Sequence, residues 1–296
     1  MTTSDDALTY VYAAAPLTAG LREALKGLRG IYGSPVLFVT AAPFASDSAD
    51  GADGADGPPV TLAFATSHVP RGDFDERALK NHFEDLEWLE DVARAHHDVV
   101  QALSTRTTVL PLRMATVYQD DDRAGQALGE QHDAFAERLS QLTAHTEFGV
   151  KIYLAPSAAP AGTGPGADTG AGTGAATTPG KAYLQRRRAQ HNAQEAVYGQ
   201  AQEAAEIVEA IASRYASQHA RHPTQRGALT GPGENVVNDA YLVPDAYAES
   251  FRAAIEDAVD VFDGIRVEVT GPWAPYSFAM PPAEPRRSAG GEEHGP

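Results

Sequence analysis

The sequence contains no cysteine among its 296 residues, which excludes disulfides, thiolate metal sites and a cysteine nucleophile. It also lacks a long apolar run. The densest one, residues 36–45, is broken by Pro43 and is far shorter than the roughly 20 residues that span a bilayer. Residues 1–8 lack the basic start and apolar stretch of a signal peptide. We therefore expect a soluble, cytoplasmic protein with no membrane partner.

Basic residues are scarce. The chain has 23 lysines and arginines against 40 aspartates and glutamates, which gives a formal net charge of -17. A protein that binds DNA or RNA normally carries a basic footprint, and anionic lipid surfaces select for one as well. The composition therefore predicts no nucleic-acid partner and disfavours binding to a membrane surface.

The sequence has none of the short motifs that mark common enzyme classes, such as Gly-x-Ser-x-Gly or His-Glu-x-x-His. Residues 174–182 come near to a phosphate-binding loop. However, five residues separate Gly174 from Gly180 where four are needed, and Ala182 stands where Ser or Thr must hold magnesium. The aspartates of residues 46–59 recur every third position, unlike the ligands of a calcium loop. We expect no enzyme activity, no cofactor and no metal site.

Three segments of low complexity interrupt the chain, namely residues 46–59, 156–180 and 281–296. Each is rich in Gly, Ala, Pro or acidic residues and cannot bury enough apolar surface to offset the entropy of ordering it. We interpret the first as a disordered insert, the second as a flexible loop and the third as a disordered tail. The predicted domains are then residues 1–146 and 147–280.

The first half has the pattern of a mixed α/β domain. Strands are expected over residues 8–13, 36–40 and 60–66, and helices over 18–28, about 73–103 and about 122–146. The second and third strands flank the insert and are expected to pair antiparallel. The helix over 73–103 has an apolar stripe from Leu86 through Ala93 and His96 to Leu103. Its acidic face, with Glu84, Glu87 and Asp91, is expected to face solvent. The alternative interpretation is a functional site made of paired carboxylates.

The second half alternates strands and helices. We expect strands over residues 148–154, 236–243 and 265–270, and helices over 181–219 and 244–262. One further strand, near residues 227–230, would give the order β-α-β-β-α-β of a ferredoxin-like sheet. The sequence thus predicts an α+β protein of two domains, of which the second is ferredoxin-like with a long helix.

That long helix has a basic end. Its apolar stripe is clean only from Val197 onward, and the earlier turns carry Arg186, Arg187 and Arg188. A helix of this length extends further than a small sheet can cover. We therefore expect these arginines to be solvated or to contact a partner.

The strand over 265–270 is expected to end at Thr270-Gly271-Pro272, because proline cannot donate to a sheet. Three aromatic residues follow. We expect Trp273 to pack into the core and to be structural. Tyr276 and Phe278 lie closer to the polar tail, and we expect them to reach a partner.

Seven segments together resemble the gas vesicle protein L/F family (GvpL/GvpF), in family order and over nearly the whole chain. They are Tyr10-Val11-Tyr12, Glu87-Trp88-Leu89-Glu90 through Arg94 and His96, Val109-Leu110-Pro111-Leu112-Arg113, Phe148-Gly149-Val150-Lys151-Ile152-Tyr153, Lys181-Ala182-Tyr183-Leu184, Asn238-Asp239-Ala240-Tyr241-Leu242-Val243, and Thr270-Gly271-Pro272-Trp273-Ala274-Pro275-Tyr276-Ser277-Phe278. The chain departs from the family at Met114-Ala115-Thr116, where an aromatic residue, Gly and Thr are usual.

Within and beside these segments we expect structural roles for Trp88, His96, Pro111 and Arg113. His96 lies on an apolar stripe, where a hydrogen-bonded core histidine is the expected role. Pro111 interrupts a short apolar run, which indicates an edge strand or a bulge.

The resemblance implies a non-enzymatic accessory protein of gas vesicle assembly. Its partners would be the apolar shell subunit, which it helps to nucleate or to join the wall, and other accessory proteins. It would be found in the cytoplasm and at the gas vesicle. Two alternatives stay open: a minor structural component of the shell, and a nucleotide-dependent assembly factor.

Overall fold

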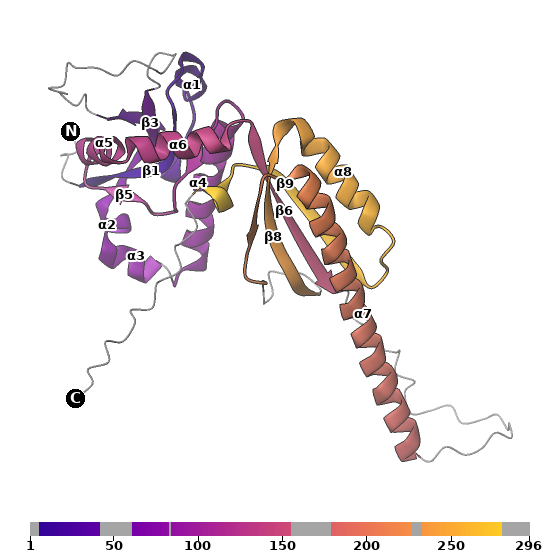
Figure 1. Ribbon diagram of the computed structural model, residues 1–296. Coiled ribbons are helices and arrows are strands. Elements are labelled where there is room, and N and C mark those ends of the chain that lie inside the picture. Colours follow the sequence, from indigo (N-terminus) through magenta and orange to yellow (C-terminus); the bar gives the residue numbers. More distant parts are fainter. Residues whose placement is uncertain (1–5, 42–60, 83, 155–178, 226–232, 280–296) are drawn as a thin grey trace, which may run out of the picture.

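The computed structural model describes residues 6–41, 61–82, 84–154, 179–225 and 233–279 (Figure 1). The predicted insert over 46–59, the predicted tail and the possible strand near 227–230 lie outside these residues. So does the predicted loop over 156–180, except for its last two residues, which already belong to a helix.

The first half is built on a five-stranded antiparallel sheet in the order β2-β3-β1-β4, with β5 also pairing with β1. β2 and β3 flank the insert and pair antiparallel, as predicted. The strands are β1 (Ala7–Pro16), β2 (Leu37–Thr40), β3 (Leu62–Pro70), β4 (Leu110–Pro111) and β5 (Val117–Tyr118).

The helices of this half are shorter than predicted. Two aspartates within the longest predicted helix cap the first turn of a new helix and so divide it. Asp75 accepts a hydrogen bond from the amide of Ala78, and Asp85 accepts from those of Glu87 and Trp88. The helix expected over 73–103 is therefore divided in three. The helix expected over 122–146 is also divided, near Gln131, where no side chain caps the new helix. The helical segments are α1 (Ala19–Ala24), η1 (Ile31–Gly33), α2 (Arg71–Phe74), α3 (Glu76–His82), α4 (Leu86–Ser104), α5 (Asp121–Glu130) and α6 (His132–Leu142).

Strand β1 is buried on both faces, so this half has three layers. Tyr10 and Tyr12 lie in one apolar cluster with residues of α1 and α4. Val11 and Ala14 lie in a second cluster with residues of α5 and α6. Alternation along the strand thus sends successive side chains to opposite helical layers.

The second half is a four-stranded antiparallel sheet in the order β7-β8-β6-β9. The extra strand lies at residues 218–221, and α7 consequently ends earlier than the predicted residue 219. Ser217 donates from its amide to the carbonyl of Leu242, which turns the chain from the helix into the sheet. The elements are β6 (His145–Leu154), α7 (Pro179–Tyr215), β7 (Gln218–Arg221), β8 (Glu234–Pro244), η3 (Asp245–Tyr247), α8 (Ala248–Val259), β9 (Ile265–Trp273) and η4 (Tyr276–Phe278).

Both faces of the second sheet are covered, by different halves of the chain. Tyr241 and Val243 of β8 cluster with residues of α7 and α8. Ala240 and Leu242 point the other way and share a cluster with Leu139 of α6. The two halves are therefore joined by a common apolar cluster. The boundary predicted at residues 146/147 stays a prediction.

Helix α7 extends beyond its sheet (Figure 1). Its buried side chains begin at Ala201, and the half-buried Val197 precedes them, in agreement with the predicted stripe. Of the side chains described between residues 181 and 196, all are exposed. We call residues 181–196 the arm.

Candidate functional site

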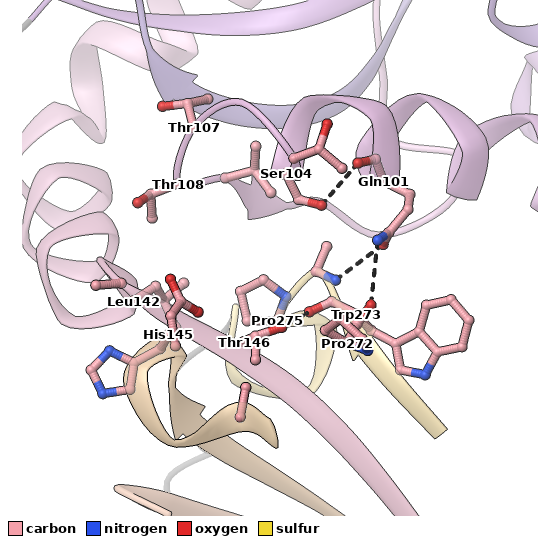
Figure 2. A pocket seen from close by; sticks show the side chains of 16 residues that line it. Gln101, Ser104, Thr107, Thr108, Leu142, His145, Thr146, Pro272, Trp273 and Pro275 are labelled. Carbon is pink, nitrogen blue, oxygen red and sulfur yellow. Dashed lines mark hydrogen bonds between the residues drawn. The ribbon is translucent and has the colours of Figure 1, made fainter. Parts of the chain in front are cut away.

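A cleft of about 450 Å³ lies where the two halves meet. Figure 2 shows it between the end of α4, the start of β6 and the end of β9. Apolar side chains such as Val109, Leu142 and Pro275 line part of it, and the Trp273 ring stands at one side. The polar lining comprises two titratable residues, His145 and Asp245, and the amide and hydroxyl groups of Gln101, Ser104, Thr105, Thr107, Thr108 and Thr146.

Strand β9 does not stop at Gly271-Pro272, contrary to the prediction. Gly271 has a φ of 121°, and a Cβ on it would lie 2.7 Å from the carbonyl oxygen of Glu147. The pairing register with β6 shifts at this place, and Trp273 pairs with Glu147 beyond it. A glycine-permitted irregularity therefore carries the strand past the proline to the cleft.

The prediction that Trp273 packs into the core is wrong. The residue is 38% exposed and is among the exposed large hydrophobic residues. Its ring packs against the His97 ring in an edge-to-face arrangement, with the ring centroids 5.4 Å apart. Thr146 Oγ1 donates to the Trp273 carbonyl at 3.2 Å. Trp273 thus offers part of its ring to solvent from a fixed backbone.

The residues that follow, 274–279, form a strap between the halves, and the prediction that Phe278 reaches a partner is wrong. Phe278 is only 3% exposed and lies in the cluster shared by both halves. Tyr276 is half-buried, packs on the first-half cluster and has a buried hydroxyl. Arg138 Nε donates to the Phe278 carbonyl at 2.6 Å. The chain therefore turns inward after Trp273.

Gln101 holds the strap at its beginning. Its side-chain oxygen accepts from the amide of Ala274 at 3.3 Å, and its Nε2 donates to the carbonyl of Pro272 at 3.4 Å. Both contacts are drawn in Figure 2. Because they flank Trp273 on either side, little backbone freedom remains to be lost when a ligand contacts the ring.

A buried carboxylate holds the strap further on. Glu147 accepts from the amide of Ser277 at 2.8 Å and from its hydroxyl at 2.7 Å. His222 Nε2 in turn donates to the Ser277 hydroxyl at 2.9 Å. Burial raises the pKa of Glu147, although the bonds from Ser277 oppose the rise. These partners come from distant parts of the chain.

A family model described as "Gas vesicle synthesis protein GvpL/GvpF" matches residues 8–280. The chain belongs to this family. Gas vesicle protein L of Streptomyces sp. (strain CB03234) is 38% identical over 278 residues, which cover 93% of this chain and 94% of that relative. Gas vesicle protein L1 of Halobacterium salinarum is 26% identical over 210 residues, or 66% and 73% of the two chains.

Solved structures give the fold of this GvpL/GvpF chain. Its structure is similar to that of GvpF from Anabaena sp. PCC7120, with a TM-score of 0.54, 16% identity and coverage of 93% and 97%. GvpF from Microcystis aeruginosa gives a TM-score of 0.54 at 19% identity and covers 92% and 99%. The mixed α/β architecture with antiparallel sheets is therefore shared with GvpF.

His96 is the hydrogen-bonded core histidine that the sequence predicts. It is 4% exposed, and its Nδ1 lies 2.9 Å from the hydroxyl of Tyr10. That hydroxyl also accepts a hydrogen bond from the amide of Ala115 at 3.0 Å. Burial lowers the His96 pKa to about 4. Ala115 has a φ of 63°, a conformation that the usual family glycine adopts more readily.

The other structural candidates differ in their contacts. Trp88 is half-buried, and its Nε1 donates to the hydroxyl of Tyr32 at 2.7 Å. Pro111 lies in β4 at the edge of the first sheet, as its residue type predicts. The Arg113 side chain is exposed, and the contacts of this residue are at its carbonyl, which accepts from the amide and hydroxyl of Thr116.

Arg187 and Arg188 are exposed on the arm, in agreement with the prediction, whereas the side chain of Arg186 lies outside the described part. Their role in binding a partner stays a prediction.

Within the described residues, no three His, Asp or Glu side chains are grouped to hold a metal ion. Across the same residues, no helix has the length and apolar character needed to cross a membrane.

Proposed function

We propose that this protein is a non-enzymatic accessory protein of gas vesicle assembly that binds the apolar shell subunit at the Trp273 cleft. Its place in a family of gas vesicle synthesis proteins supports the general role. Apart from His145 and Asp245, the lining of the cleft consists of hydroxyl, amide and apolar groups, which suits the binding of a peptide segment. The shell subunit and other gas vesicle proteins are the proposed partners.

The exposure of Trp273 carries the proposal. Tryptophan is enriched among the few residues that supply most of the binding energy of an interface, and such residues sit beside pockets. Gln101 and Thr146 hold the backbone on both sides of this ring, which reduces the entropy lost on binding. In the proposed complex, an apolar segment of the shell subunit covers the ring and enters the cleft. The apolar surface of the ring and of the cleft is then no longer exposed to water.

The acidic composition suits the same role. A shell subunit that lines a gas compartment must expose apolar surface before assembly and would aggregate without a partner. A carrier with a net charge of -17 stays soluble while the complex forms. We therefore place the protein in the cytoplasm during capture and at the gas vesicle on delivery, in a chaperone-like role.

We also propose that the second half is a ferredoxin-like domain with the first half as a separate domain. The element order β6-α7-β7-β8-α8-β9, the sheet order β7-β8-β6-β9 and the placement of both helices on one face support this assignment. In such an arrangement the cleft lies at a domain interface, where ligand sites are common.

Replacing Trp273 by Ala tests the proposal. Loss of a central aromatic side chain of an interface costs about 2 kcal/mol or more, so shell-subunit affinity should fall about 30-fold. The measurement is the amount of shell subunit that co-purifies with the tagged protein after co-expression. Trp273→Phe should retain most of the binding.

The matched control is Val261→Ala, which shortens an exposed apolar side chain beyond the end of α8. It should capture as much shell subunit as the unchanged protein. Equal capture by Trp273→Ala and the unchanged protein would remove the cleft from the proposal. Capture that requires ATP or GTP would favour the nucleotide-dependent alternative, and retention in washed, mature vesicles would favour the structural one.

A further inference from the structure

The arm has a basic face with an exposed leucine at its centre. Lys181, Leu184, Arg187 and Arg188 are spaced at three and four residues and so share one side of the helix. All four are exposed, and Leu184 is 62% exposed. In the described part of the chain, none of the three cations forms an ion pair with an acidic side chain.

The first two turns of α4 form a surface of opposite charge. Leu86 is 79% exposed and lies beside Glu87, Glu90 and Asp91, which are also exposed. The apolar stripe that the sequence predicts through Leu86 does not match the buried side of the helix. That side begins at Val92 instead, which leaves Leu86 off the core. One of the three carboxylates, Glu90, is paired within the helix, with Arg94.

The two surfaces complement each other but cannot meet within one copy. Each combines a solvent-exposed leucine with three charges of one sign. The arm points away from α4, past the far end of the second sheet (Figure 1). At ~1.5 Å per residue the arm is about 24 Å long, enough to lie across a neighbouring molecule.

We propose that the arm of one copy docks on the start of α4 in a second copy of this chain. The two leucines meet, and Arg187 and Arg188 face Glu87 and Asp91. Charge complementarity argues for this occupant, because the chain is strongly acidic overall and the arm is a local concentration of positive charge. Two copies can exchange arms in a closed dimer, or each can dock on the next in an open series.

This contact is independent of the proposed shell-subunit site. The cleft adjoins residues 101–108 at the end of α4, whereas the acceptor surface is at the start of the same helix. If the proposed shell-subunit site is wrong, the proposed contact between copies is unaffected, and the reverse also holds. Each proposal is tested with different variants and a different measurement.

Exchanging the charges provides the test. Arg187→Glu with Arg188→Glu reverses the arm, and Glu87→Arg with Asp91→Arg reverses the acceptor. The molar mass of each full-length variant is measured by light scattering after gel filtration, at low and at high salt. We expect the unchanged protein to be larger than a monomer at low salt and to dissociate as salt screens the contact.

Each reversed variant alone should bind itself at least tenfold more weakly. An equimolar mixture of the two, and the variant with all four substitutions, should recover the association because opposite charges face each other again. Circular dichroism verifies that every variant is folded. Asp91→Arg alone, which leaves the first turn of α4 unaltered, replaces the double acceptor variant if that one fails to fold.

Three results would overturn the proposal: a monomer at every concentration at low salt, an arm-reversed variant with unchanged mass, or a mixture that stays monomeric. If the chain stays monomeric and its arm captures a different acidic gas vesicle protein, the arm does not dock on a second copy of this chain. That result would also overturn the proposal.

Discussion

Replacing Phe278 by Ala should lower the free energy of unfolding by about 3–5 kcal/mol, because the ring is buried in the cluster shared by both halves. Replacing Trp273 by Ala should lower it by only about 1 kcal/mol or less, since part of that ring already faces solvent. This is the reverse of the ranking that residue size and sequence position alone suggest.

Urea unfolding monitored by far-ultraviolet circular dichroism measures both values on the same scale. Each variant is the matched control for the other, because both substitutions truncate an aromatic residue within one short segment. If Trp273→Ala unfolded as readily as Phe278→Ala, the inward turn of the strap would be wrong, and the binding surface would have to be sought elsewhere.

His96 should make the protein less stable as the pH falls from about 6.5 to about 4. Its pKa in the folded chain is about 4, below the ordinary value of 6.5, so the unfolded chain takes up the proton first. The stabilising effect is complete above pH 6.5 and is lost as the pH approaches 4. At about 1.4 kcal/mol per pKa unit, the loss amounts to roughly 3 kcal/mol.

Other groups around this ring do not reverse the sign. Tyr10 and Tyr276 contact the His96 ring, and burial raises the pKa of each of these phenols, so both stay neutral in acid. Charge on His97 lowers the His96 pKa further, and a hydrogen bond with the Leu112 backbone raises it by less than burial lowers it. Glu147 acts in the opposite direction, because its raised pKa means that stability is lost as pH rises through that value.

Thermal unfolding across this pH range is therefore best compared with that of His96→Gln, which cannot titrate. The difference in stability between the two proteins should change by roughly 3 kcal/mol between pH 6.5 and 4. The Glu147 contribution is common to both and cancels. A constant difference across the range would show that the ring is accessible to water or already charged.

The sequence predicts the sheets better than it predicts the helix ends. Period-two alternation located most of the long strands, because each buries at least one face. The long helices were divided at Asp75, Asp85 and Gln131, and at the first two an aspartate accepts amide bonds that begin a new helix. An apolar stripe alone does not reveal such divisions, as exposed Leu86 shows.

The strap could not be predicted from local patterns for a different reason. The direction of the chain after Trp273 depends on Gln101, Arg138 and Glu147, which are more than 100 residues away in sequence. Polar residues further along the chain suggested that Phe278 faces outward, whereas long-range hydrogen bonds turn it inward. The exposed arm, by contrast, follows directly from helix length and from where the apolar stripe begins.

Fluorescence quenching of Trp273 tests the central claim most directly. The chain has two tryptophans, so Trp88→Phe leaves Trp273 as the sole reporter. Acrylamide should quench the free protein readily, and adding the shell subunit should reduce the quenching and shift the emission to shorter wavelength, because the ring becomes covered. Shell-subunit binding that leaves both the quenching and the emission of Trp273 unchanged would contradict the proposed site.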